Sequence, residues 1–133
     1  MNAIRNFTDY NSDYLLADSF NSTSTSYETT QVASADVVLD LSDKIGMDVC
    51  INVDIEKLTA IGTETYGLKV QDGDAVGFGG LVQDTIQVVL KAYGTKQLQP
   101  PIVINVKYGF IRLQMIGANT PDWTVTSWAA PAE

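Results

Sequence analysis

The sequence predicts an all-β domain, specifically a jelly-roll-like antiparallel β-sandwich of seven to eight strands. Apolar and polar residues alternate in short stretches from residue 36 onward, which is the period of a strand with one buried face. Turn residues separate these stretches at intervals of roughly 8–15 residues, a spacing typical of sandwiches and barrels. No stretch shows the 3.6-residue period of an amphipathic helix.

Each predicted strand places its apolar residues on one face. The residues predicted to face the core are Val37, Leu39, Leu41, Val49, Ile51, Val53, Ile55, Tyr66, Leu68, Val70, Ile86, Val88, Leu90, Ala92, Ile102, Ile104, Val106, Ile111, Leu113 and Met115. Asp72-Gly73 predicts a tight turn, and the glycine-rich stretch 71–84 predicts an exposed loop. Gly109 predicts a bend where the chain changes sheet, before the strands at 110–116 and 122–128.

The first quarter of the chain differs in composition, so we expect a polar N-terminal arm at residues 1–35 and the β-sandwich domain at 36–133. Nine of the eighteen residues from 17 to 34 are serine or threonine, which leaves little apolar surface to bury. Two interpretations remain open: a segment that follows its own domain's surface, with a short helical turn near 13–18, or an arm that docks on a neighbour. Deleting residues 1–33 is expected to leave a folded domain.

Charge and residue usage exclude several classes of function. The net charge of −8 and the lack of a basic run disfavour nucleic acid and anionic membrane surfaces as partners. The chain has no histidine and a single cysteine, Cys50, which excludes Ser-His and Cys-His catalysis and a Cys/His zinc site within it. The N-terminus shows no apolar signal region, and no apolar run approaches a spanning helix. We expect no cofactor, no metal and no enzymatic activity.

Two groups of acidic residues are candidates for chemical sites. Asp72, Asp74 and Asp84 could form a loose Ca²⁺ site, but Val76 and Gln83 occupy ligand positions of an EF-hand loop counted from Asp72. A solvated turn is the favoured interpretation of this stretch. Glu64 and Asp84 could serve a small glycoside hydrolase, which needs two acids across a cleft.

The stretch 107–128 contains an arginine in the middle of a predicted strand, followed by two tryptophans. Arg112 falls on the face opposite Ile111 and Leu113, where a carboxylate across the sheet is its expected partner. Trp123 and Trp128 have opposite parity, so one should face the core and the other the surface. Exposed tryptophan near arginine is typical of protein interfaces.

The order of these segments resembles the small jelly-roll cement, or decoration, proteins of tailed-bacteriophage capsids. The resemblance rests on Val38-Leu39-Asp40-Leu41, Phe110-Ile111-Arg112-Leu113 and Thr124-Val125-Thr126, whereas the long arm and residues 95–101 depart from the family pattern. It implies a protein on the outer capsid surface that bridges subunits of the major capsid protein, forms a homo-oligomer (dimer or trimer) and has no enzymatic activity. It also implies synthesis in a host bacterial cytoplasm and a final location on the virion exterior.

The sequence therefore predicts a viral structural protein that acts by adhesion, through many modest contacts repeated over a lattice. The residues predicted to contact partners are Tyr10, Tyr14, Phe20, Tyr27, Arg112 and Trp128. The alternative is a carbohydrate- or receptor-binding sandwich, which predicts an exposed aromatic platform with carboxylates in the loop at 71–84. The hydrolase with Glu64 and Asp84 is a third possibility.

Overall fold

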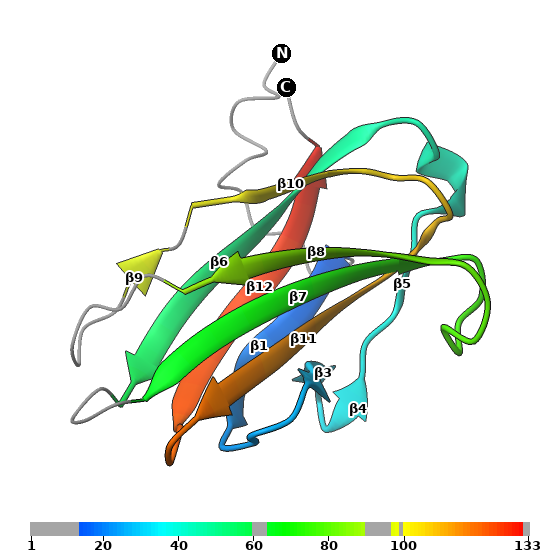
Figure 1. Cartoon of the computed structure of the whole chain (residues 1–133). Coiled ribbons are helices and arrows are strands. Elements are labelled where there is room, and N and C mark those ends of the chain that lie inside the picture. Colours follow the sequence, from blue (N-terminus) through cyan, green and yellow to red (C-terminus); the bar gives the residue numbers. More distant parts are fainter. Residues whose placement is uncertain (1–13, 60–63, 90–96, 99, 132–133) are drawn as a thin grey trace.

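The chain folds into two antiparallel sheets packed face to face (Figure 1). The structure is a computed structural model, and it describes residues 14–59, 64–89, 97–98 and 100–131. The first sheet has the order β1 (Leu15–Ser22), β12 (Trp123–Pro131), β6 (Asp48–Leu58), β10 (Ile102–Asn105), and β9 (Gln97–Leu98) also pairs with β6. The second sheet has the order β2 (Glu28–Thr29), β11 (Phe110–Ala118), β7 (Thr65–Gly73), β8 (Val82–Val88), and β5 (Leu39–Asp40) also pairs with β11.

The topology in the described part of the chain is that of a jelly roll. β2 and β5 both pair with β11, and β9 and β10 both pair with β6, so the ten segments of the two sheets make eight passes of the chain. In chain order the passes alternate between the sheets except at the β7–β8 hairpin. The passes β1, β6, β9 with β10, and β12 belong to the first sheet, and the passes β2 with β5, β7, β8 and β11 belong to the second. Repeated crossing between two antiparallel sheets defines the jelly roll, so the predicted fold class is confirmed.

Smaller elements connect the passes. β3 (Gln31–Val32) and β4 (Ala35–Asp36) form a separate two-stranded ladder, and Ser42–Lys44 is a single 3-10 turn. The described residues contain no α-helix. None of their helical turns is long and apolar enough to cross a membrane.

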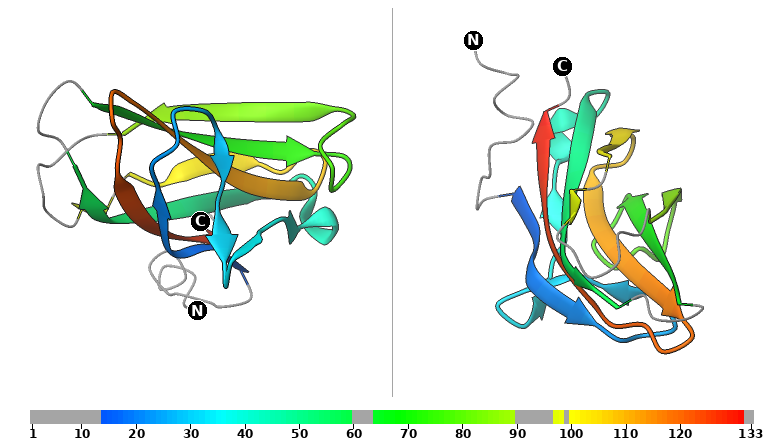
Figure 2. Two further views of the ribbon diagram at one scale, coloured as in Figure 1. Left: turned by 90° about the horizontal axis from the view of Figure 1, so that it is seen from below. Right: turned by 90° about the vertical axis from the view of Figure 1, so that its left-hand side faces the viewer.

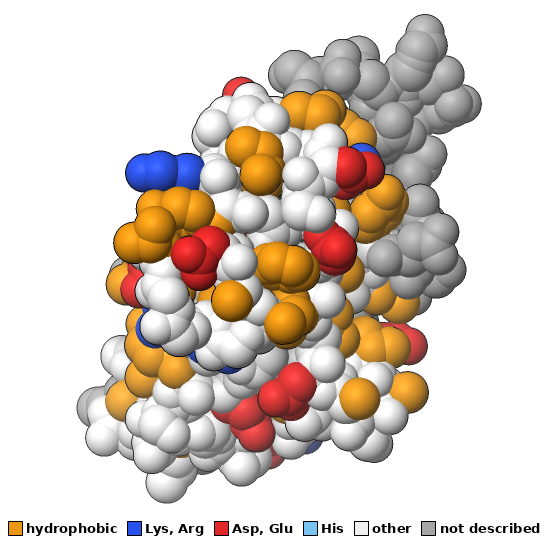
Figure 3. All heavy atoms as spheres, turned by 90° about the vertical axis from the view of Figure 1, so that its right-hand side faces the viewer, with side chains coloured by type: hydrophobic (Ala, Val, Ile, Leu, Met, Phe, Trp, Pro, Cys, Tyr) orange, Lys and Arg blue, Asp and Glu red, His pale blue; other side chains and the backbone are white. Residues whose placement is uncertain are grey.

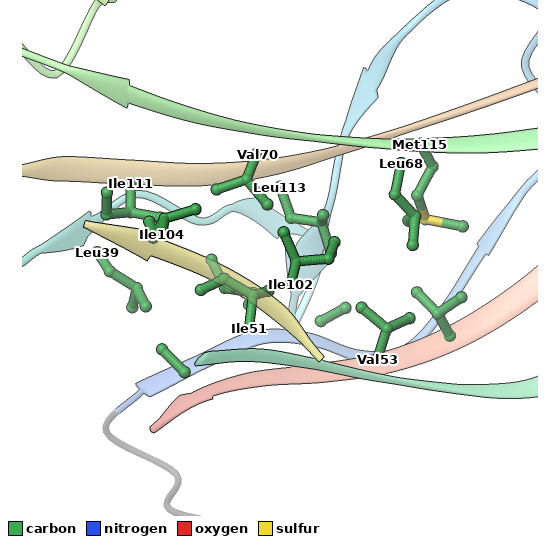
Figure 4. Packing of buried hydrophobic residues seen from close by; sticks show 14 of the residues in the cluster. Leu39, Ile51, Val53, Leu68, Val70, Ile102, Ile104, Ile111, Leu113 and Met115 are labelled. Carbon is green, nitrogen blue, oxygen red and sulfur yellow. The ribbon is translucent and has the colours of Figure 1, made fainter. Parts of the chain in front are cut away.

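Alternation within each strand places the core between the sheets (Figure 4). Most residues predicted to face inward are buried there, including Ile51, Leu68, Ile111, Leu113 and Met115, all with no exposed surface. Trp123 is also fully buried, and its ring lies 5.0 Å from that of Tyr66. Period-2 alternation therefore predicted the core of these strands correctly.

The prediction for β8 was wrong. Ile86 was expected to face inward, yet it is directly opposite Lys69 of β7 on the outer face and is 63% exposed. The inward positions of β8 are Gln83, Thr85 and Gln87, which pair with Asp72, Val70 and Leu68. Backbone register, set by the length of the loop at 74–81, reverses every side chain of a strand when it shifts by one residue. Leu90 and Ala92 lie outside the described residues.

The arm predicted for residues 1–35 also differs from the structure. β1 is a full strand of the first sheet, paired with β12 from Leu15 to Ser22, and no helical turn replaces it. Leu16 and Ala17 belong to the core, and the buried Thr30 hydroxyl donates to the Leu16 carbonyl at 2.6 Å. The sandwich therefore starts near residue 15, so a chain without residues 1–33 would lack part of its core.

The passage from β10 to β11 is held by a buried carboxylate. Asp72 accepts hydrogen bonds from the backbone N–H groups of Lys107, Tyr108 and Gly109, at 2.7, 3.2 and 2.8 Å. Gly109 has a φ of +118°, and a Cβ there would lie 2.8 Å from the Cα of Ser42. The predicted bend at Gly109 is thus confirmed, and glycine is required by both its backbone angle and its neighbour.

Candidate interaction surfaces

Arg112 lies on the outer face of the second sheet, as predicted, but its direct partner is an amide. Its Nε donates to Oε1 of Gln71 at 2.6 Å, and Nε2 of Gln71 donates to Asp84 at 3.1 Å. The guanidinium lies 4.0 Å from the centre of the Phe78 ring. Burial lowers the pKa of Arg112, while the charges of Asp36 and Asp84 oppose that shift. Arg112 therefore anchors the loop at 74–81 to the sheet.

The two tryptophans do face opposite sides, but neither is exposed. Trp123 is fully buried in the core, and Trp128 is on the outer face of the first sheet with 8% of its surface exposed. Trp128 pairs with Leu15 on β1 and Asn52 on β6, in a partly apolar region that also contains the buried Cys50. Burial, followed by the charge of Asp48, raises the pKa of the Cys50 thiol, so it is a poor nucleophile at neutral pH.

The remaining aromatic residues predicted to bind partners are used in different ways. Tyr10 lies outside the described residues. Phe20 is half-buried and packs against the core from β1. Tyr27 is 37% exposed, and the ammonium of Lys69 lies 3.9 Å from the centre of its ring. Phe20 on the first sheet and Tyr27 beside Lys69 of the second sheet thus do not share one aromatic platform.

Tyr14 lines a pocket of about 220 Å³ beside the last residues of β12. Its other walls include Leu41, Met47, Val49 and Ala129, and Lys44 is the one charged residue in the lining. The wall is mainly apolar, so the pocket suits an aliphatic or aromatic group more than a polar one.

The stretch 71–84 is not one loop with a tight turn at Asp72-Gly73, as predicted: residues 71–73 end β7, residues 82–84 begin β8, and its acids do not converge. Asp72 points inward and accepts backbone N–H groups, whereas Asp84 pairs with Gln71 on the opposite face of the sheet. Among the described residues no group of three or more acid, cysteine or histidine side chains could hold a metal ion. The loose calcium site considered for Asp72, Asp74 and Asp84 is therefore not formed.

Glu64 and Asp84 are also separate. Glu64 directly precedes β7 and is buried, with the Thr120 hydroxyl 3.3 Å from its Oε2. Asp84 is paired with Gln71, seven residues further along the same strand, which corresponds to about 23 Å of extended chain. Glycoside hydrolysis needs carboxyl groups within about 10 Å of each other, so this pair does not form such a site.

Four exposed apolar residues that the sequence did not predict lie on two loops at one end of the sandwich. Ile45 and Met47 follow the 3-10 turn, and Val76 and Leu81 lie in the loop between β7 and β8. Their exposed fractions are 56%, 49%, 62% and 61%. Figure 3 shows this end, with apolar patches separated by carboxylates. We call these four residues the loop-end surface. One feature of the sequence could have indicated their exposure: these apolar residues occur near glycine and aspartate in stretches that predict turns.

Comparison with known proteins supports the fold. No protein-family model and no curated protein matches the chain. Among solved structures, a chain of the T13 viral particle of IBDV, an icosahedral virus, is similar with a TM-score of 0.53 and 16% identity. The match covers 87% of this chain and 29% of that one, so this chain spans less than a third of the similar protein. A chain from the Gt strain of infectious bursal disease virus matches with a TM-score of 0.49, 14% identity and coverages of 87% and 30%.

The match to the T13 particle chain assigns this chain to an architecture. Its fold is an all-β two-sheet jelly roll like that of a virus particle protein. At 16% identity the likeness concerns the fold, so what the protein does must be argued from its own surfaces.

Proposed function

We propose that the chain is a structural protein of a virus particle, and that it acts as a cement protein on the outer capsid surface, in contact with the major capsid protein. The observation that carries this proposal is the jelly-roll topology, which the chain shares with a protein of an icosahedral particle. The sequence resemblance to phage cement proteins supports the same function from separate features of the chain.

The charge of the chain supports an exterior position. With 16 acids against 8 basic residues it would be repelled by packaged nucleic acid, whereas the outer surface of a shell imposes no such penalty.

The loop-end surface supplies the contact area for such a role. Four large apolar side chains, each about half exposed or more, lie on the two loops at one end of the sandwich. Fully burying one such side chain contributes about 1.5–3 kcal/mol, so a partner that covers several gains a useful affinity. Repetition over a lattice multiplies this contact through avidity.

The proposal can be tested on virus particles purified from the organism whose genome encodes this chain. Antibodies raised against the recombinant chain should label intact particles in immunogold electron microscopy, because the protein is exterior. Labelling only of disrupted particles, or no labelling, would contradict the proposal.

A binding experiment then tests the contact surface. Particles stripped of the protein should bind the recombinant chain again, and Ile45→Asp with Val76→Asp should weaken binding at least tenfold. Val103→Asp is the matched control, since Val103 is equally exposed at 56% but lies on β10, outside the two loops that carry the loop-end surface. Equal loss of binding in the control would mean that the loop-end surface is not the contact.

A further inference from the structure

β8 is a regular outer strand of the second sheet, and the other outer strands are not. Its seven residues pair with β7 without a break, from Val82 opposite Gly73 to Val88 opposite Gly67. β1, the outer strand of the first sheet, has two register shifts and a φ of +46° at Ser19. The remaining outer segments, β2, β5, β9 and β10, have two to four residues each. Short or bulged outer strands resist pairing with another chain, and β8 has neither protection.

The hydrogen-bonding groups of β8 that face outward can be identified. The N–H of Val89 donates to the Tyr66 carbonyl at 3.1 Å, and direct bonds recur at every second pair of an antiparallel ladder. Gln83, Thr85 and Gln87 therefore bond to β7, and Asp84 and Ile86 direct their N–H and C=O groups to the open edge. Within the described residues no further strand pairs with β8 there.

β8 directs polar side chains toward the interior and apolar side chains outward, the reverse of a strand whose apolar face closes a core. Polar Gln83 and Thr85 face the interior, while Val82 and Ile86 face outward on either side of the exposed Asp84. Ile86 has the largest exposed fraction among the exposed large apolar residues of the described chain, at 63%. The strand contains no lysine and no proline, the residues that commonly block an open edge.

We propose that this edge accepts residues 1–13 of a second copy of the chain as an added strand. The segment contains no glycine or proline and can extend for about 43 Å, against about 23 Å for β8. In an antiparallel register Ala3, Arg5 and Phe7 would lie opposite Ile86, Asp84 and Val82. This register pairs the one side-chain cation of the segment with the acid of β8.

The position of the strands favours a second copy over the same chain. β1, which continues the segment, is an outer strand of the first sheet, and β8 is an outer strand of the second sheet on the other side of the molecule (Figure 2). A segment in the same chain would have to cross a sheet to reach β8. This inference concerns self-association, so it does not depend on the proposed role in a capsid.

Reversing the charges of Arg5 and Asp84 in the full chain tests whether these two residues pair between copies. Arg5→Glu and Asp84→Lys should each weaken self-association at least tenfold in sedimentation velocity, and the double variant should restore it to within about threefold. Asp43→Lys makes the same change of charge on the 3-10 turn, at a side chain that is 77% exposed and lies 3.5 Å from Lys44, and it should leave association unchanged. Ile86→Pro should abolish association while leaving the β7 ladder intact, since the N–H that it removes points outward. Thermal melts of all variants check that they are folded.

Amide hydrogen exchange, followed residue by residue by NMR, identifies the occupant. In the associated wild-type chain the amide hydrogens of Asp84 and Ile86 should exchange slowly. Dilution or Arg5→Glu should make this exchange fast. The amides of Gln83, Thr85 and Gln87 should stay slow throughout. A monomer at all concentrations with fast amides at 84 and 86 would overturn the proposal. So would slow amides in an undissociated Arg5→Glu protein, which would indicate a second β8, or slow amides in a dilute monomer, which would indicate the same chain.

Discussion

β1 and β8 are both outer strands, one in each sheet, and they serve the fold in opposite ways. β1 is irregular along its backbone, yet it buries Leu16 and Ala17 completely. β8 is regular along its backbone, yet it directs Gln83 and Thr85 inward and exposes Ile86. A strand at the edge of a sheet can thus complete the core or remain available to a partner. The direction of its apolar side chains indicates which role it has.

The largest expected difference between the two strands is in stability. Leu16→Ala should lower the free energy of unfolding by about 2–5 kcal/mol, because it removes a fully buried side chain and leaves a cavity. Ile86→Ala on the exposed face of β8 should change it by no more than about 0.5 kcal/mol. Urea unfolding measures both. Similar losses for the two variants would mean that β8 also contributes to the core.

A second, smaller difference concerns two acids of the β7–β8 hairpin. Asp72→Asn should destabilise the chain by about 3 kcal/mol, because the buried carboxylate accepts three backbone N–H groups and hydrogen bonds to a charged acceptor are strong. Asp84→Asn, on the exposed face, should have an effect below about 0.5 kcal/mol. Thermal unfolding at neutral pH compares them, and an Asp72→Asn protein as stable as wild type would exclude the carboxylate as the clamp of residues 107–109.

The smallest expected effect is a loss of stability at alkaline pH, caused by two titrating side chains on the inner strands β6 and β7. Burial raises the pKa of the Tyr66 phenol on β7 and of the Cys50 thiol on β6. Because each pKa is higher in the folded state than in the unfolded state, the protonated groups add to the free energy of unfolding. This stabilisation is complete below the unfolded pKa values, about 8.5 for cysteine and about 10 for tyrosine. It is lost as the pH rises through the folded values.

Melting temperatures measured from pH 7 to pH 11 test this expectation. The decline should be shallower in Tyr66→Phe, which lacks the titrating phenol, and unchanged in Ile86→Ala. If Ile86→Ala altered the decline as much as Tyr66→Phe did, the alkaline effect could not be assigned to the inner strands.

Much of the fold could be predicted from alternation in the sequence. The inward faces of β6, β7, β10 and β11 were predicted correctly because each strand has one apolar face throughout. β8 could not be predicted in this way: Ile86 and Val88 alternate as inward residues would, but the register with β7 places Ile86 outside. β1 was missed because a hydroxyl-rich composition indicated an arm, although Leu16 and Ala17 suffice to anchor a strand.

The contact residues were less predictable than the fold. Parity placed Arg112 on the correct face and the two tryptophans on opposite faces. The structure shows that Gln71, Phe78 and neighbouring strands cover much of Arg112 and Trp128. Ile45, Met47, Val76 and Leu81 carry no periodic signal, since their exposure depends on how two loops lie at the end of the sandwich.

The sequence by itself determined the class of fold, the acidic surface and the exclusion of histidine- and disulfide-based chemistry within the chain, because composition and period-2 alternation are local properties. Only the tertiary structure decided which strand closes the core and which leaves its edge open. That outcome depends on register between segments far apart in the chain, and a shift of one residue exchanges the two faces of a strand.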